Sequence, residues 1–318
     1  MKALWLENRK LTFRQDVPKP VPASEEALVR VRLAGICATD LEMVRGYYPF
    51  TGIPGHEFVG EVVAAPDEES WLDKRVVGEI NLTCGVCWAC RNGRRSHCEN
   101  RTTLGIHDRD GAFAEYLTLP LENLHPVPET VPDEAAVFTE PLAAALQVQE
   151  QVHIHPNDRV LVIGAGRLGQ LIAQTLALTA GHLRVVARHP QQRKLLTQRG
   201  IQTLNDGEVG ERAWDLVIEA TGSAGGFELA RAAVRPRGLI VLKSTYAGSI
   251  QADFSTLVVN EITLIGSRCG PFAPALRLLE SELVEPRPLI AERHPLADGV
   301  LAFEHAAQSG VMKVLLSL

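Results

Sequence analysis

The sequence predicts an α/β fold in which a β-rich domain is joined to a doubly wound domain with a parallel sheet. Up to about residue 150, short apolar segments alternate with clusters of Pro, Gly and charged residues, as in strands and turns. After Pro156-Asn157-Asp158, apolar runs alternate with helical stretches, which is typical of a parallel sheet covered on both faces. The chain has 318 residues, enough for about two domains.

Composition and charge disfavour several classes of protein. The chain is 46% hydrophobic and 22% charged, as expected for a globular rather than a disordered protein. Its net charge of −6 disfavours a nucleic-acid-binding surface. The sequence has no apolar run of about 18 residues, and the segment after Met1 lacks the apolar core of a signal peptide. We therefore expect a cytoplasmic protein without nucleic-acid or membrane partners.

The β-rich character of the first domain comes from three segments of high β-propensity. They are Ala27–Leu33, Glu57–Val63 and Arg75–Ile80, and Pro, Gly and charged clusters separate them. We expect these segments to be strands of an antiparallel β domain with irregular loops.

The second domain is predicted to contain five buried strands connected by four helices. The expected strands are Val160–Ile163, Leu183–Ala187, Trp214–Glu219, Leu239–Lys243 and Ile262–Gly266. The expected helices are Leu168–Thr179, Pro190–Arg199, Gly226–Val234 and Phe254–Asn260. Right-handed crossovers would make this domain doubly wound. Beyond it, we expect helices over Pro271–Val284 and Pro295–Gly310 and a closing strand over Val311–Leu318.

A glycine-rich loop follows the first of these strands. The G-x-G-x-x-G pattern consists of Gly164, Gly166 and Gly169, with Arg167 and Leu168 inside it, and it leads into an amphipathic helix. The three glycines would permit a tight turn, close approach of a pyrophosphate and close helix–strand packing, respectively. Because a helix N-terminus attracts phosphates, we predict a dinucleotide site here, with a plain tight turn as the alternative.

The end of the second strand indicates which dinucleotide binds. An NAD site is expected to carry an acidic residue there, but no Asp or Glu occurs between Gly181 and Gln202, and Arg188 occupies the place. A guanidinium suits a 2′-phosphate, so NADP(H) is favoured over NAD(H), with His189 and Arg193 as further candidates for the phosphate contact. A solvated arginine at the strand end is the alternative.

Four of the six cysteines lie within 15 residues of one another. They are Cys84, Cys87, Cys90 and Cys98, and they are too close in sequence for all of them to form disulfides without strain. Four thiolates at these spacings can surround a tetrahedral Zn²⁺, and such a saturated site would be structural. An iron–sulfur cluster is the alternative.

A second set of possible metal ligands is spread along the chain. It consists of Cys37, His56 and Glu140. A thiolate, an imidazole and a carboxylate would form an open zinc site with one position left for water or substrate. Singly, each residue also has an ordinary interpretation, such as a buried thiol or a solvated carboxylate.

Taken together, these motifs resemble the zinc-dependent medium-chain dehydrogenase/reductase family. In order, they are Gly-Ile-Cys-x-Thr-Asp, Gly-His-Glu-Phe-Val-Gly, the four cysteines, Thr-Glu-Pro-Leu-Ala and Gly-x-Gly-x-x-Gly. The Glu-Pro-Leu-Ala element is most similar to the alcohol/polyol dehydrogenases of the sorbitol dehydrogenase branch. The resemblance implies a chaperonin-10-like catalytic domain over residues 1–147 and 272–318, interrupted by a Rossmann domain over residues 148–271.

The resemblance also implies roles for individual residues at the open zinc site. Cys37, His56 and Glu140 match the catalytic zinc ligands, and Glu57 matches a glutamate that can exchange with water as a ligand. The resemblance therefore implies two zinc ions per chain, one catalytic and one structural.

Two further residues match groups around the metal. Asp40 matches the carboxylate that orients the histidine ligand, and Thr39 matches the hydroxyl that passes the substrate proton outward. Many family members have a histidine as the outer relay where this chain has Glu42, so either Glu42 or a water path would accept the proton. The aromatic segment Tyr47-Tyr48-Pro49-Phe50 would be either a wall of the pocket mouth or a packed surface loop.

The implied activity is hydride transfer between a secondary alcohol or polyol and NADP (or NAD), which gives a ketone or aldehyde. The implied partners are a small alcohol or carbonyl substrate and further copies of the chain, as a homodimer or homotetramer. One alternative is a metal-free quinone or enoyl reductase-type enzyme, although such enzymes lack this ligand set. Another is a non-catalytic nucleotide- or redox-sensing protein on the same fold, since fold does not determine function.

Overall fold

The computed structural model describes residues 1–47, 49–245 and 249–318, which form two compact units. Unit 1 consists of Met1–Glu140 and Phe272–Leu318, and unit 2 consists of Pro141–Pro271. Helix α4 (Thr139–Gln151) contains the boundary between these units and also the boundary expected after residue 147. No helix in the described part of the chain is long and apolar enough to cross a membrane.

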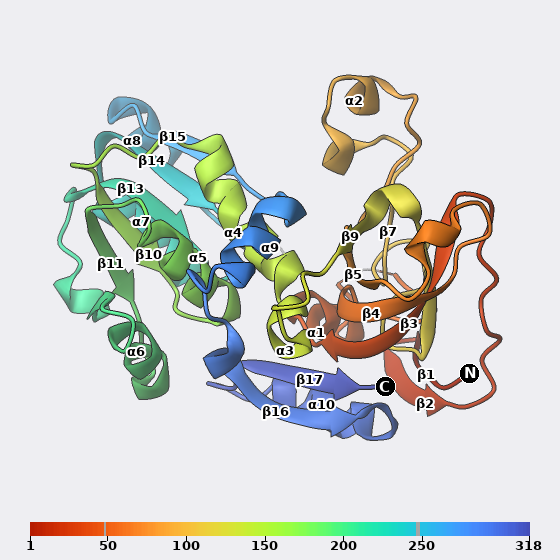
Figure 1. Ribbon diagram of the computed structural model, residues 1–318. Coiled ribbons are helices and arrows are strands. Elements are labelled where there is room, and N and C mark those ends of the chain that lie inside the picture. Colours follow the sequence, from red (N-terminus) through yellow and green to blue (C-terminus); the bar gives the residue numbers. More distant parts are fainter. Residues whose placement is uncertain (48, 246–248) are drawn as a thin grey trace. The chain divides into compact units, whose positions relative to one another are not determined.

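Unit 1 is built on a seven-stranded sheet (Figure 1). In spatial order, its strands are β16 (Ile290–Pro295), β17 (Lys313–Ser317), β3 (Glu26–Gly35), β4 (Glu57–Ala64), β5 (Arg75–Gly78) and β9 (Leu124–Pro126), and β8 (Tyr116–Pro120) also pairs with β3. Strands β16 and β17 are parallel, and the other pairs are antiparallel. The last strand of the chain therefore lies inside the sheet of the first unit.

Shorter elements complete unit 1. They are β1 (Ala3–Glu7), β2 (Lys10–Arg14), β6 (Asn81–Leu82), β7 (Thr102–Thr103), α1 (Ala38–Val44), α2 (Trp88–Arg91), α3 (Asp133–Ala136), α9 (Phe272–Glu280) and α10 (Gly299–Ala306). The three strands predicted before residue 80 are confirmed as β3, β4 and β5. The helix expected from Pro295 begins only at Gly299, because the preceding residues form β16 and a short 3-10 turn, Leu296–Asp298.

Unit 2 contains a six-stranded parallel sheet, as the alternation of apolar and helical segments predicted. In spatial order, its strands are β12 (Gln202–Leu204), β11 (His182–Val186), β10 (Arg159–Ile163), β13 (Trp214–Glu219), β14 (Val234–Leu242) and β15 (Thr263–Gly266). The helices between them are α5 (Arg167–Leu176), α6 (Pro190–Thr197), α7 (Ala224–Ala233) and α8 (Phe254–Val259). The order reverses between β10 and β13, the place where doubly wound sheets bind ligands.

The core of unit 2 explains why its strands could be recognised. Leu161, Val217 and Ile240 are fully buried at the centre of neighbouring strands, so each strand carries a continuous apolar run. Strand β12 was missed because it has only three residues, none of which is fully buried. Strand β14 begins at Val234, five residues before the apolar run that indicated it.

A close backbone crossing beside the residue before His56 requires glycine at positions 105 and 111. A Cβ atom added at Gly105 or at Gly111 would lie 2.2 Å from the carbonyl oxygen of Gly55. The amide of Gly111 also donates to the carbonyl of Ile53 at 2.6 Å. This crossing holds the segment that leads into His56 against a second stretch of backbone.

We predict that Gly111→Ala destabilises the protein by about 1–3 kcal/mol, because the added methyl group meets backbone atoms that cannot move aside. The matched control is Gly225→Ala, where a Cβ meets no atom within 4 Å and no loss of stability is expected. Calorimetric unfolding of both variants checks this. Equal stabilities of the two variants would show that the crossing is not tight.

Candidate metal and nucleotide sites

The first candidate site lies where strands β3 and β4 meet helix α1. Gly35 at the end of β3 pairs with Glu57 at the start of β4, so Cys37 and His56 are brought close together by strand register. Gly35 has no side chain, and a Cβ there would lie 2.5 Å from Glu57 Oε2. Ligand atoms of Cys37, His56 and Glu57 all lie within 4.8 Å of one another. The structure thus groups three of the predicted site residues.

The buried carboxylate of Asp40 holds two members of this group in place. Its Oδ2 accepts a hydrogen bond from the backbone amide of Cys37 at 2.8 Å, and its Oδ1 lies 3.2 Å from His56 Nδ1. Burial lowers the pKa of His56, but the charge of Asp40 and hydrogen bonds to Asp40 and Cys37 outweigh it and raise the pKa well above 6.5. The surroundings of the imidazole therefore favour positive charge.

The third member, Glu57, is held by a lysine from the C-terminal strand. Lys313 on β17 donates to Glu57 Oε2 and to the carbonyl of Ile36, and both charged side chains are almost completely buried. The other carboxylate oxygen, Oε1, is buried and has no hydrogen-bond partner among the described residues. A buried carboxylate with one unpartnered oxygen, grouped with a thiol and an imidazole, is a donor set that fits a zinc ion.

Glu140 is not part of this group. It lies in the first turn of α4, and its carboxylate is outside the set of ligand atoms that lie within 4.8 Å of one another. The carboxylate that the structure places beside Cys37 and His56 is that of Glu57.

The two residues predicted to carry the substrate proton, Thr39 and Glu42, both lie on α1. Thr39 Oγ1 lies 3.9 Å from Cys37 Sγ, so the hydroxyl is next to the candidate ligand. Glu42 instead forms an ion pair with Arg45 at 2.5 Å on a partly exposed part of the helix. In the aromatic segment that follows, Tyr48 lies outside the described residues.

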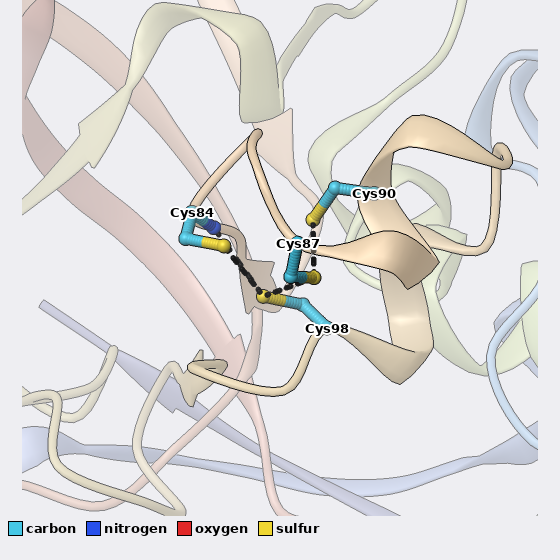
Figure 2. A group of neighbouring side chains, drawn as sticks. All are labelled: Cys84, Cys87, Cys90 and Cys98. Carbon is cyan, nitrogen blue, oxygen red and sulfur yellow. Dashed lines mark hydrogen bonds between the residues drawn. The ribbon is translucent and has the colours of Figure 1, made fainter.

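The second candidate site is the loop that carries the four cysteines (Figure 2). Sulfur–sulfur distances are 3.5 Å for Cys87–Cys90, 3.5 Å for Cys84–Cys98 and 3.9 Å for Cys87–Cys98. A tetrahedral ion with Zn–S bonds of about 2.3 Å would place its sulfurs about 3.8 Å apart. Hydrogen bonds from the backbone amides of Val86 and Cys87 lower the pKa of Cys84 to about 6. The loop therefore presents sulfurs at the spacing of a structural zinc site.

The third candidate site is a pocket at the carboxyl ends of β10 and β13. Its lining residues are Ile163, Gly164, Ala165, Gly166, Val186, Arg188, His189, Gln192, Ala220 and Thr221. Gly164 has a positive φ of 102°, and a Cβ at Gly169 would lie 1.8 Å from the Gly164 carbonyl oxygen. Helix α5 begins at Arg167, and its N-cap residue, Gly166, supplies no side-chain cap. The first amides of α5 can therefore bind a phosphate.

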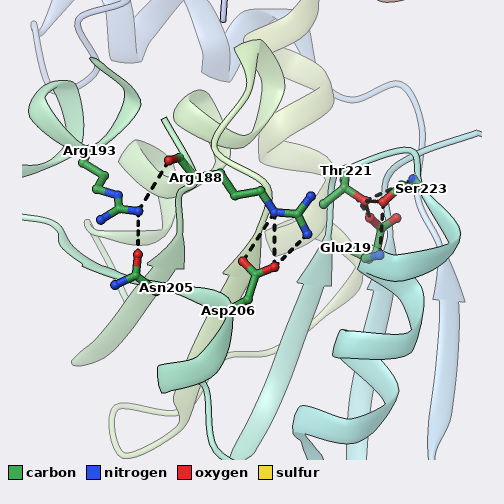
Figure 3. Close-up of polar contacts among 8 residues, drawn as sticks. Arg188, Arg193, Asn205, Asp206, Glu219, Thr221 and Ser223 are labelled. Atoms are coloured by element: carbon green, nitrogen blue, oxygen red, sulfur yellow. Dashed lines mark hydrogen bonds and ion pairs between the residues drawn. The ribbon is translucent and has the colours of Figure 1, made fainter. Parts of the chain in front are cut away.

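Arg188 lies in this pocket but has an acidic partner that the sequence did not reveal (Figure 3). Its Nη2 and Nε donate to Asp206 Oδ2 at 2.7 and 3.2 Å. The expectation that no acidic residue lies nearby is therefore wrong, because the chain returns through β12 and brings Asp206 beside the second strand. Arg188 Nη1 makes no hydrogen bond to any described residue.

The neighbouring polar residues form hydrogen bonds to other groups of the protein. Arg193 Nε donates to the carbonyl of Ala187 at 2.7 Å, and its Nη2 donates to Asn205, so this guanidinium braces the loop. Glu219, buried at the end of β13, accepts a hydrogen bond from the amide of Thr221 at 2.6 Å. These contacts shape the pocket. In the sequence, the one indication of Glu219 was its position at the end of an apolar strand.

The chain is similar to known dehydrogenases over its full length. Residues 23–129 match the alcohol dehydrogenase GroES-like domain. A sorbitol dehydrogenase of Halalkalibacterium halodurans is 28% identical, and an L-threonine 3-dehydrogenase of Saccharopolyspora erythraea is 31% identical, each over 95% of this chain and 94% of the relative. The solved structure of a zinc-binding dehydrogenase of Sinorhizobium meliloti bound to NADP has a TM-score of 0.92 at 28% identity, covering 100% of this chain and 99% of that one.

We predict that Lys313→Met lowers the free energy of unfolding by about 3–5 kcal/mol, because it leaves the Glu57 carboxylate buried without its partner. The double variant Glu57→Gln/Lys313→Met should be more stable than the single Lys313→Met variant, since no unpaired charge remains. Urea-induced unfolding of the two variants and the parent chain measures both effects. Additive losses in the double variant would contradict an interaction between the two side chains.

Proposed function

The chain belongs to the zinc-dependent medium-chain dehydrogenase family, and we propose that it oxidises a secondary alcohol or polyol reversibly to the carbonyl compound with NADP(H). The observation that carries the proposal is the grouping of Cys37, His56 and Glu57, whose Oε1 is buried without a hydrogen-bond partner among the described residues. The same chain carries a phosphate-binding pocket at the switch point of a parallel sheet. One site suits an alcohol oxygen and the other a nicotinamide dinucleotide.

The residues around Cys37 would have separate roles in the reaction: some position the metal ligands, and one transfers the proton. When bound, zinc would act as a Lewis acid toward the alcohol, and the nicotinamide would carry the hydride. Asp40 fixes the backbone at Cys37 and orients His56, which keeps both ligands in place. The hydroxyl of Thr39 lies beside the Cys37 sulfur and can accept the substrate proton and pass it outward.

The proposed metal content is two zinc ions per chain. Cys84, Cys87, Cys90 and Cys98 would hold the structural ion, as their sulfur spacings support. Cys37, His56 and Glu140 would hold the catalytic ion, with Glu57 as the carboxylate that exchanges with water. The placement of Glu57 beside Cys37 and His56 supports its part in this exchange.

The reaction is tested by incubating the protein, as purified with its zinc, with a panel of secondary alcohols and polyols and following the absorbance of reduced nicotinamide. Cys37→Ser is the matched inactive control, because it removes one ligand of the open site. We expect turnover by the parent chain that the variant lacks. A chain that retains zinc and binds NADP(H) but oxidises no alcohol would instead be a nucleotide-sensing protein.

The two metal sites should respond differently to loss of one thiolate. We predict that Cys84→Ser lowers the thermal midpoint strongly, because a closed site contributes folding free energy, whereas Cys37→Ser removes activity with a small change in midpoint. Elemental analysis should give one zinc ion fewer in Cys37→Ser than in the parent chain. Normal folding and normal turnover in both variants would refute these assignments.

We also propose that the chain forms a homodimer or homotetramer in the cytoplasm. Helix α8 exposes Phe254, Val258 and Val259 next to β15, the edge strand of the parallel sheet, and such an apolar patch supports association with a second copy. All six cysteines are free thiols in the structure, which suits a reducing compartment.

The remaining proposal is that NADP(H) binds more tightly than NAD(H). Arg188 supports it, because a charge-assisted contact to a 2′-phosphate contributes about 1.5–3 kcal/mol, or roughly 10- to 150-fold in affinity. The negative charge of Asp206, which is paired with Arg188, repels a 2′-phosphate. We therefore expect the preference of the parent chain for NADP(H) to be near the lower end of this range.

We therefore predict that Arg188→Asp reverses the preference, while Asp206→Asn increases it by releasing the guanidinium. Fluorescence titration of the parent chain and the two variants with NADPH and NADH gives the three affinity ratios needed. Equal affinities in the parent chain, or a lower NADPH affinity in Asp206→Asn, would overturn the role of Arg188.

A further inference from the structure

A separate group of metal-ligating side chains lies at the edge of unit 1, apart from the zinc ligands described above. It consists of Glu292 and His294 on β16 and His305 on α10, and ligand atoms of all three lie within 4.8 Å of one another. His305 Nδ1 is 2.7 Å from Glu292 Oε2, and His294 Nε2 is 3.4 Å from the same oxygen. Both imidazoles are partly buried, whereas the carboxylate is half exposed.

The local fold brings these three residues together. Strand periodicity places Glu292 and His294 on one face of β16, and Arg293 between them contacts Glu134 instead. Helix α10 packs against β16 and β17 and presents His305 from the next segment of the chain (Figure 1). Two consecutive elements of the C-terminal segment therefore supply every ligand.

The chemistry of the group favours a metal over a simple ion pair. His294 Nε2 and His305 Nδ1 are buried atoms with no well-formed hydrogen bond among the described residues, and both lie close to one carboxylate oxygen. In a tetrahedral zinc site with bonds of about 2.0–2.1 Å, ligand atoms are separated by roughly 3.3 Å. The distance from His294 to Glu292, 3.4 Å, matches this spacing, whereas the distance from His305 to Glu292, 2.7 Å, would lengthen when the ion binds. A single bound cation would satisfy both ring nitrogens and the carboxylate at once.

We propose that Glu292, His294 and His305 form a third metal site, at the protein surface, and that the divalent transition metal ion bound there is Zn²⁺. Two imidazoles and one carboxylate suit zinc rather than calcium or magnesium, which require mainly oxygen ligands. The exposed carboxylate side leaves a coordination position open to solvent, so the ion can exchange. Bound there, it joins the edge strand β16 to helix α10.

The experiment counts zinc by difference, so it does not depend on how many other sites are filled or on catalytic activity. The parent chain and the variants His305→Asn and Glu292→Gln are dialysed to equilibrium against micromolar free Zn²⁺, and bound zinc per chain is measured by elemental analysis. His107→Asn is the matched control, because His107 is an exposed histidine beside Asp108 at 3.6 Å. Circular dichroism reports whether each variant folds.

We expect the parent chain and His107→Asn to bind one more zinc ion than His305→Asn and Glu292→Gln, whose affinity for that ion should fall at least about 10-fold. Added zinc should also raise the thermal midpoint of the parent chain more than that of folded Glu292→Gln. Equal zinc content and equal midpoint shifts in the parent and Glu292→Gln would overturn the proposal. A loss of the extra ion in His107→Asn would overturn it as well.

Discussion

The buried ion pair between Glu57 and Lys313 connects the parts of the chain on which the first metal site depends. It joins the start of β4 to β17, and the two partners are 256 positions apart in the sequence. Burying two charges costs free energy that their attraction only partly returns, so such a pair is a weak source of stability. Its effect here is positional: it holds one oxygen of the Glu57 carboxylate, which is grouped with Cys37 and His56, and leaves the other oxygen unpartnered among the described residues.

The candidate sites in the two units favour ligands of opposite charge. In unit 1, the carboxylate of Asp40 and the Cys37 sulfur surround an imidazole and favour a cation. In unit 2, the N-terminus of α5 and the guanidinium of Arg188 favour an anion. Asp206 and Glu219 temper that positive potential, since they accept hydrogen bonds from the groups that face the pocket. A dehydrogenase needs both kinds of site, one for a metal and one for a dinucleotide.

Local patterns predicted the elements, whereas long-range contacts remained hidden. Strands β10, β11, β13 and β14 of unit 2 were visible because each contains a buried apolar run. The glycine loop was visible because its spacing reflects backbone geometry. Asp206 follows Arg188 by 18 residues, and only the return of the chain through β12 makes them neighbours. Lys313 sits in an apolar strand, and its partner cannot be inferred from spacing. Strand β16 was missed because its residues are mostly exposed, and because it forms a strand only by pairing with β17.

The discontinuity of unit 1 has a consequence for biosynthesis. Strand β17 lies between β16 and β3, so the seven-stranded sheet lacks an interior strand until Lys313–Ser317 has left the ribosome. Unit 2 is contiguous in sequence and can fold while this gap is still open. During that interval, β3 exposes an unpaired edge beside Gly35, and Glu57 lacks its lysine. The nascent chain is therefore most vulnerable to aggregation before β17 emerges, and this is the stage at which a chaperone would matter most.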